Sequence, residues 1–204
     1  MKIGLFGGTF DPIHNGHLWI AKNAYETYSL DKVLFIPSGI SYMKSGVLSV
    51  SHRVNMVKLA ISDYPFFDLS TIESDKSKNS YSYETILELK KENPNDEFFF
   101  IIGFDSLKNM VKWKNPEIIF KEVTVLVAVR DEGDSNLIQE YIDDYSKKYG
   151  ACIKIIQCEK IEVSSTQIRQ DIINGNDVSK ALPSKVYSYI IDNRLYKEMA
   201  NERQ

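Results

Sequence analysis

Several common structural signals are scarce in this sequence. Its 204 residues include only two cysteines, Cys152 and Cys158, and these do not form a Cys-x-x-Cys pair. No apolar run approaches the roughly 20 residues that cross a membrane, and the first residues lack the basic and apolar regions of a signal peptide. These absences argue against a disulfide scaffold and against a membrane protein. They predict a chain that works in a reducing, cytoplasmic setting.

A strong excess of charge of one sign is also missing. The formal net charge is -3 and the isoelectric point is about 5.7, so no overall field draws the chain to nucleic acid or to an anionic membrane. We therefore expect neither of these as a partner, and any bound anion must be held by a local cluster of residues. The sequence leaves open whether the chain forms a homo-oligomer.

The sequence does contain enough apolar material for one full core, since 43% of its residues are hydrophobic. Apolar runs that read as strands lie at residues 2–6, 32–36, 67–70, 98–102, 123–129 and 153–156. They alternate with helical patterns, and nearly continuous apolar runs are typical of parallel strands buried on both faces. We predict an α/β fold with a Rossmann-like, doubly wound parallel sheet flanked by helices. Residues 1–204 are expected to form one domain, with 165–196 as a small helical C-terminal part.

Helical spacing also predicts which residues of two helices face the core. The expected core residues are Val50, Val54, Val57 and Ile61 on a helix capped by Ser49, and Leu137, Tyr141, Ile142 and Tyr145 on a helix that stops at Gly150.

The most informative stretch follows the first predicted strand and reads GGTFDPIHNGH over residues 7–17. Paired glycines before a helix start are typical of a phosphate-binding turn, because Gly7 and Gly8 can adopt positive φ and let an anion approach the backbone. We expect Asn15 to cap the helix, whose positive dipole end also favours an anion. The alternative is an ordinary tight connection between a strand and a helix.

Two of the three histidines lie in this stretch. His14 and His17 are three residues apart, so both can project from one face of the first helical turn toward a bound anion. The same spacing is near that of zinc ligands, but no cysteine or third convergent ligand adjoins them. Anion binding is therefore the favoured interpretation, ahead of incidental histidines and of a metal site.

A second stretch with the same character reads VSSTQIR over residues 163–169. Clustered hydroxyl groups at a helix start provide caps and free amides together, and Arg169 lies one turn inside on the same face as Ser165. These groups could surround the distal phosphates of a nucleoside triphosphate. The alternative is a simple Ser/Thr capping cluster.

Four further residues are candidates because of their positions. Asp105 and Arg130 each follow a predicted buried strand, and open α/β sheets bind ligands at the carboxyl ends of their strands. Trp113 offers a flat surface for an aromatic ligand ring, and Lys44 is a lone base in a loop. The alternatives are a helix cap for Asp105, a core position for Trp113, and solvated side chains for Arg130 and Lys44.

Together, the two stretches resemble the HxGH and SSTxIR motifs of the nucleotidyltransferase superfamily that contains the nicotinate and nicotinamide mononucleotide adenylyltransferases. The doubled glycine suggests the bacterial nicotinate branch, and the similarity runs over residues 2–196. It implies that the chain transfers an adenylyl group from ATP to nicotinate mononucleotide, giving deamido-NAD and pyrophosphate, in NAD biosynthesis. It also implies Mg²⁺ carried by the ATP phosphates, with no metal ligands from the protein.

The resemblance implies a role for each matching residue. The expected charge-neutralising groups in catalysis are His14, His17, Lys44 and Arg169. The residues expected to bind ATP are Gly7, Gly8, Thr9, Phe10, Ser164, Ser165 and Thr166. Those expected to bind nicotinate mononucleotide are Thr85, Asp105, Trp113 and Arg130.

This sequence departs from the family pattern at three places. Residues 41–44 read SYMK where the family has a proline pair, a histidine and a lysine; Ser82 replaces a threonine; and Lys114 replaces an aromatic residue beside Trp113. Three alternatives stay open: a nicotinamide mononucleotide adenylyltransferase, a phosphopantetheine adenylyltransferase, and a catalytically silent nucleotide sensor on the same fold.

Overall fold

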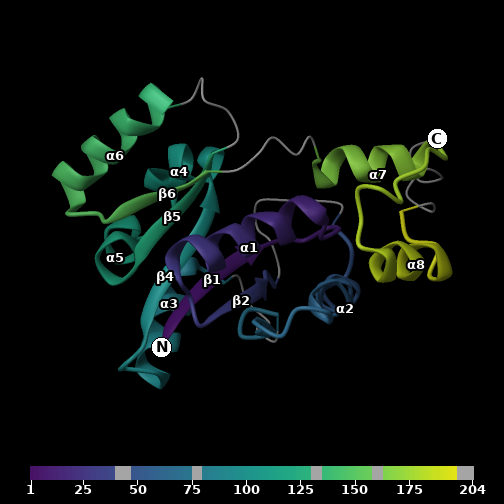
Figure 1. The fold of residues 1–204 in the computed structure, drawn as a ribbon, viewed down its shortest axis with the longest axis horizontal. Helices are drawn as coiled ribbons and strands as arrows, with labels where there is room; N and C mark the ends of the chain where they lie inside the picture. Colours follow the sequence, from purple (N-terminus) through teal and green to yellow (C-terminus); the bar gives the residue numbers. More distant parts are fainter. Residues whose placement is uncertain (40–46, 75–79, 130–134, 158–162, 197–204) are drawn as a thin grey trace.

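A six-stranded parallel sheet forms the centre of the molecule (Figure 1). The computed structural model describes residues 1–39, 47–74, 80–129, 135–157 and 163–196. The strands are β1 (Lys2–Gly8), β2 (Lys32–Pro37), β3 (Phe67–Leu69), β4 (Glu97–Gly103), β5 (Thr124–Val129) and β6 (Ile153–Gln157). They are ordered β3-β2-β1-β4-β5-β6, and every neighbouring pair is parallel. The predicted doubly wound sheet is confirmed.

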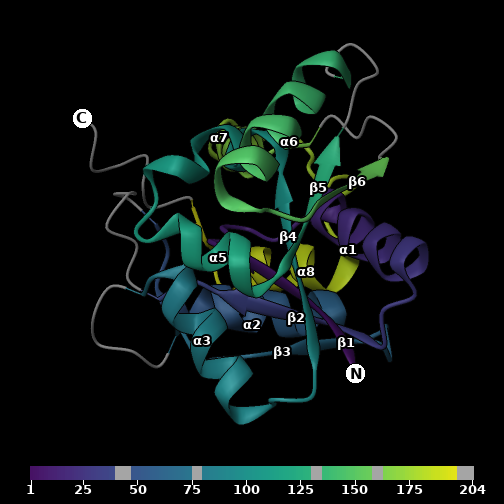
Figure 2. The ribbon, with the colours of Figure 1, turned by 90° about the vertical axis from the view of Figure 1, so that its left-hand side faces the viewer.

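Eight α-helices surround the sheet in the described residues. They are α1 (Asn15–Tyr28), α2 (Val50–Ile61), α3 (Ser82–Glu92), α4 (Phe104–Asn109), α5 (Pro116–Glu122), α6 (Ser135–Tyr149), α7 (Ser165–Ile173) and α8 (Ser184–Asp192). A 3-10 turn, Met110–Lys112, follows α4. Buried residues of α1, α2, α7 and α8 pack in one apolar cluster, and those of α3 to α6 pack in a second. Figures 1 and 2 show these helices around the sheet. In the part of the chain described, no helix is both long enough and apolar enough to span a membrane.

The central strand β1 contributes to both clusters. Leu5 belongs to the second cluster and its neighbour Phe6 to the first, because successive side chains of a strand point to opposite faces. The strand is therefore buried on both sides, as its continuous apolar run predicts.

Helix α2 buries a different stripe from the one its valines predict. Ser49 caps it as expected, accepting from the His52 amide. Val50 and Val54 are only half-buried, however, and the buried residues are Arg53, Met56, Val57, Ala60 and Ile61. The prediction was right for Val57 and Ile61 and wrong for the two other valines. The reason is that an arginine occupies an inward position.

Arg53 is 1% exposed, and its guanidinium donates to three backbone carbonyl groups. Nε reaches Leu48 O at 3.1 Å, Nη1 reaches Thr9 O at 2.8 Å and Nη2 reaches Gly39 O at 3.0 Å. Burial lowers the pKa of Arg53, and the charge of Asp11 opposes that effect. The arginine thus ties the turn after β1 to both flanks of residues 40–46.

The C-terminal helices are also fastened to this turn. The Tyr196 hydroxyl donates to Asp11 Oδ1 at 2.8 Å, and both residues are buried. Burial, together with the neighbouring carboxylate, raises the pKa of Tyr196. On the same side of the molecule, His52 of α2 is hydrogen-bonded to Tyr189 of α8 at 2.9 Å. Figure 1 shows α7 and α8 as a pair beside the start of α1.

We expect Arg53→Met to lower the free energy of unfolding by about 3 kcal/mol, because it leaves three carbonyl groups without their charged donor. Urea denaturation measures this. Lys58→Met on the same helix is the matched control, since Lys58 is exposed, and it should cost less than about 0.5 kcal/mol. Equal losses in the two variants would contradict the role assigned to Arg53.

The Tyr196 contact predicts a loss of stability in alkali. The pKa of this phenol is higher in the folded chain than in the unfolded one, so its contribution is complete below pH 10 and is lost as the pH rises beyond that value. Between pH 8 and pH 11, the free energy of unfolding of the native protein should fall by roughly 1.4 kcal/mol more than that of Tyr196→Phe. Denaturation curves at pH 8 and 11 check this, and parallel losses would refute it.

Candidate active site

A cavity of about 600 Å³ opens at the carboxyl ends of β1, β2 and β4. The strand order reverses between β1 and β4, and open α/β sheets bind ligands at such a point. Among the residues that line the cavity are Gly7, Gly8, Thr9, Phe10, His17, Ser38, Glu73, Tyr81, Ser82, Thr85, Gly103, Asp105, Asn109, Trp113 and Lys114. Much of the first predicted stretch therefore shares one space with Thr85, Asp105 and Trp113.

The glycine pair has a different conformation from the predicted one. Gly7 and Gly8 continue β1, paired with Ile36 and Pro37, and the positive φ of the turn (49°) falls on Phe10 instead. A Cβ on Gly8 would lie 2.9 Å from the Phe10 ring, whereas one on Gly7 would meet only the Phe100 ring, at 4.0 Å. Gly8 is thus needed so that the Phe10 ring can fold back. Gly7 leaves room beside the backbone.

The start of α1 corrects a second expectation. The N-cap is His14, and Asn15 is the first helical residue. The Asn15 amide donates to Ala181 O at 3.0 Å and its side chain donates to Lys180 O at 3.0 Å. Asn15 therefore joins α1 to the segment before α8 and does not cap its own helix.

The two histidines lie together, as their spacing predicts. Their rings are stacked with centroids 3.7 Å apart, and His14 is 3% exposed whereas His17 lines the cavity. The His14 amide donates to His17 Nδ1 at 3.2 Å. The neutral His17 ring accordingly carries its hydrogen on Nε2. The Phe10 ring meets it edge-on at 5.1 Å and fixes its plane.

The second stretch lies against the same turn. Ser165 Oγ donates to Pro12 O at 2.9 Å, and Arg169 Nη1 donates to Asp11 O at 2.7 Å. Both side chains therefore lie on one face of α7, as expected. Ser164 is the N-cap and accepts from the Gln167 amide at 3.2 Å.

Thr166 completes this group, because its Oγ1 lies 3.3 Å from Arg169 Nη2. Two segments more than 150 residues apart thus meet at the turn. The described lining of the cavity includes no residue of α7.

Aromatic and polar groups form the other end of the cavity. Trp113 packs edge-on against Phe100 of β4, with centroids 6.2 Å apart. Thr85 is buried, and its hydroxyl donates to Glu73 at 2.8 Å. Asp105 is exposed at the start of α4 and pairs with Lys108 at 2.6 Å. The N-cap of α4 is Gly103, so Asp105 is not the cap that the alternative interpretation required.

Two predicted site residues, Lys44 and Arg130, lie outside the described residues. Within the described ranges, no group of three or more His, Cys, Asp or Glu side chains could hold a metal ion.

Sequence reasoning missed several residues that shape the site. They are Arg53, which holds the turn at Thr9 O, and Glu73 and Tyr81, which line the cavity. Of these three, only Arg53 could have been assigned from its spacing along a helix. It is the first of four residues spaced i, i+3, i+4 and i+7, the others being Met56, Val57 and Ala60. This spacing fits one buried face of a helix better than the spacing of the valines does. The partners of Glu73 and Tyr81 are set by the tertiary fold.

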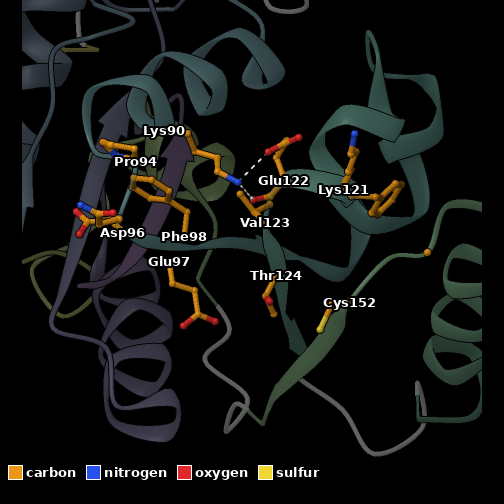
Figure 3. Close-up of a pocket in the computed structure, with 13 residues that line it drawn as sticks. Lys90, Pro94, Asp96, Glu97, Phe98, Lys121, Glu122, Val123, Thr124 and Cys152 are labelled. Atoms are coloured by element: carbon orange, nitrogen blue, oxygen red, sulfur yellow. Dashed lines mark hydrogen bonds and ion pairs between the residues drawn. The ribbon is translucent and has the colours of Figure 1, made fainter.

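A second cavity, of about 380 Å³, lies at the opposite edge of the sheet (Figure 3). It is bordered by Glu97 and Thr124, which are the first residues of β4 and β5. Lys90 there pairs with Glu122 at 2.8 Å (Figure 3). Its position at the amino ends of the strands and this internal pairing distinguish it from the first cavity.

The arrangement around the first cavity is suited to an elongated anion with a planar ring. The turn after β1 and His17 supply donors to its wall, and the start of α7 is bonded to the far side of the same turn. Trp113 and Tyr81 add aromatic faces to the wall. Such a site can hold phosphate groups by hydrogen bonds and charge while an apolar wall orients the ring.

Known proteins share these features. The cytidylyltransferase-like family matches residues 5–171. A probable nicotinate-nucleotide adenylyltransferase of Lachnoclostridium phytofermentans is 40% identical over 96% of this chain and 98% of its own, and one of Clostridium botulinum is 40% identical over 97% and 98%.

Solved structures share the fold. A Plasmodium falciparum nicotinic acid mononucleotide adenylyltransferase complexed with NaAD superposes with a TM-score of 0.80 at 22% identity, over 96% of this chain and 97% of its own. A putative nicotinate-nucleotide adenylyltransferase from Vibrio parahaemolyticus gives 0.70 at 23% identity, over 97% and 96%. The chain therefore belongs to the cytidylyltransferase-like family and, within it, to the nicotinate-nucleotide adenylyltransferases, a family of nucleotidyltransferase enzymes.

Proposed function

We propose that this chain transfers the adenylyl group of ATP to nicotinate mononucleotide, forming deamido-NAD and releasing pyrophosphate, as a step of NAD biosynthesis. The observation that carries the proposal is the meeting of α7 with the turn after β1, through Arg169 on Asp11 O and Ser165 on Pro12 O. The turn lines a cavity large enough for a nucleotide, and the start of α7 is proposed to reach the same ligand. The names of relatives about 40% identical over nearly the whole chain support the same reaction.

ATP is proposed to lie with its phosphates between the turn and the start of α7. The proposed contacts are Gly7, Gly8, Thr9, Phe10, Ser164, Ser165 and Thr166. Gly7 supports close approach, since it lines the cavity and has no side chain to cover its backbone. The start of α7 supplies hydroxyl groups and the positive end of a helix dipole.

Mg²⁺ is proposed to arrive bound to the ATP phosphates, where it neutralises charge and bridges their oxygens. The side chains around the turn fit the phosphates of such a complex, because they are mainly hydroxyl, imidazole and guanidinium donors. Asp11 is the buried carboxylate nearby, and it is already engaged by Tyr196. No protein ligand set for the metal is proposed.

The mononucleotide is proposed to enter from the aromatic end, near Thr85, Asp105 and Trp113, with Arg130 as a further contact outside the described residues. Its phosphate oxygen then attacks the α-phosphorus of ATP in line, and the bond between the α-phosphorus and the oxygen that bridges to the β-phosphorus breaks. Pyrophosphate leaves with that bridging oxygen. Such a transfer needs alignment and charge neutralisation more than a protein nucleophile.

Charge neutralisation is assigned to four side chains: His14, His17, Lys44 and Arg169. His17 is proposed to donate through Nε2–H, which is supported by its place in the cavity lining and by the bond from the His14 amide to Nδ1. His14 lies behind it and supports the ring by stacking. Arg169 is held against the turn by its bond to Asp11 O.

The proposed reaction predicts a substrate order. Pyrophosphate release should be fastest with ATP and nicotinate mononucleotide, with deamido-NAD as the nucleotide product, and much slower with nicotinamide mononucleotide or phosphopantetheine. Coupled pyrophosphate assays with product identification by mass spectrometry measure this. Faster release with either other acceptor overturns the substrate assignment, and no release with any acceptor favours a nucleotide sensor.

We expect His17→Ala to lower kcat by roughly 100-fold or more while the Kd for ATP changes by less than about threefold, as for a contact that strengthens in the transition state. Steady-state kinetics and equilibrium ATP binding measure the two effects. His52→Gln is the control, because the third histidine lies between α2 and α8, and its kcat should stay near that of the native protein. A loss confined to ATP affinity in His17→Ala would contradict the assigned role.

A further inference from the structure

Lys114 places an ammonium group at the aromatic end of the cavity. Its Nζ lies 4.2 Å from the centroid of the Tyr81 ring, and both residues line the cavity beside Trp113. Among the residues that the structure describes, no carboxylate forms an ion pair with Lys114, whereas Asp105 on the same wall is paired with Lys108. This end of the cavity therefore offers a positive charge to a ligand.

The backbone around Lys114 is held in place by its neighbours. The Trp113 amide donates to Met110 O at 3.0 Å, Asn115 adopts the left-handed conformation with φ at 49°, and Pro116 begins α5. The Tyr81 face attracts the ammonium group by a cation–π contact. The positive charge is therefore positioned before a ligand arrives, and less side-chain entropy is lost on binding.

The turn after β1, which is proposed to bind phosphate, lines the same cavity as Lys114, Trp113 and Tyr81. A mononucleotide with its phosphate near the turn after β1 would direct its ring toward Trp113 and Tyr81. A substituent of that ring would then come close to Lys114 Nζ. A carboxylate there would gain a charge-assisted hydrogen bond, whereas a neutral carboxamide of the same size would gain much less.

We propose that Lys114 binds the ring carboxylate and makes this site prefer nicotinate mononucleotide over nicotinamide mononucleotide. The inference rests on the proposed function, because it assumes that a pyridine mononucleotide occupies the cavity. It makes Lys114 a specificity-determining residue that acts through its charge.

Isothermal titration of each mononucleotide tests this in the native protein, Lys114→Gln and Lys114→Arg. We expect Lys114→Gln to bind nicotinate mononucleotide about fivefold more weakly while its affinity for nicotinamide mononucleotide changes by less than about twofold. Lys114→Arg should keep the preference, because the charge remains. Lys91→Gln removes the same charge from an exposed site outside the cavity and is the matched control.

Salt dependence is the second readout. Raising the salt from 50 to 500 mM should bring the native protein's Kd values for the two mononucleotides closer together, because salt screens an exposed ion pair. The ratio of the two Kd values in Lys114→Gln should stay almost unchanged. A preference retained in Lys114→Gln overturns the proposal. So does an equal loss for both mononucleotides, which would place the ammonium group on the shared phosphate.

Pyrophosphate release separates this proposal from the proposed reaction. If the native protein forms deamido-NAD and Lys114→Gln binds both ligands with the native ratio, only the role of Lys114 is wrong. If Lys114→Gln loses the binding preference and the native protein releases no pyrophosphate, the role of Lys114 stands and the reaction is wrong.

Discussion

The carbonyl groups of the turn after β1 are anchored by side chains from two helices that are far apart in the sequence. Arg53 of α2 donates to Thr9 O, and Ser165 and Arg169 of α7 donate to two carbonyl groups further along. In a trans peptide the next N–H points away from the carbonyl, so anchoring Thr9 O directs the Phe10 amide away from Arg53. Carbonyl oxygens that would repel an anion are thereby occupied by the protein. In the proposed function, this is how a chain with a net charge of -3 provides a local site for phosphate.

The spacing of hydrophobic residues along the sequence is enough to predict much of the fold. The six strands form where their apolar runs predict. The four inner strands are buried, whereas β3 and β6 at the sheet edges each bury one residue, Phe67 and Ile156. The errors are local: Leu137 was expected inside and is 42% exposed, because the next residue, Ile138, turns to the core in its place. Arg53 displaced a valine stripe because three carbonyl groups compensate its charge, and such partners cannot be read from helical spacing. Helix α5, which begins at Pro116, was not predicted because its seven residues offer too short a pattern.

The sequence predicts the residues of the candidate site better than it predicts the physical reasons for their conformations. The two motif stretches meet, as the expectation that both face one triphosphate requires. The reason given for the glycine pair was wrong, since the positive φ belongs to Phe10 and Gly8 is needed for the space taken by that ring. The Lys114 contact with Tyr81 joins residues 33 positions apart and depends on how α3 packs near α5. Periodicity carries no information about such pairs.

The bond between Tyr196 and Asp11 joins one of the last described residues to one of the first. During synthesis the N-terminal strand and turn leave the ribosome early, and α7, α8 and Tyr196 follow only after most of the chain has been made. A nascent chain can thus assemble much of its sheet while the turn after β1 still lacks the supports that α7 and Tyr196 supply. The proposed nucleotide site is in that sense completed only once synthesis has passed Tyr196.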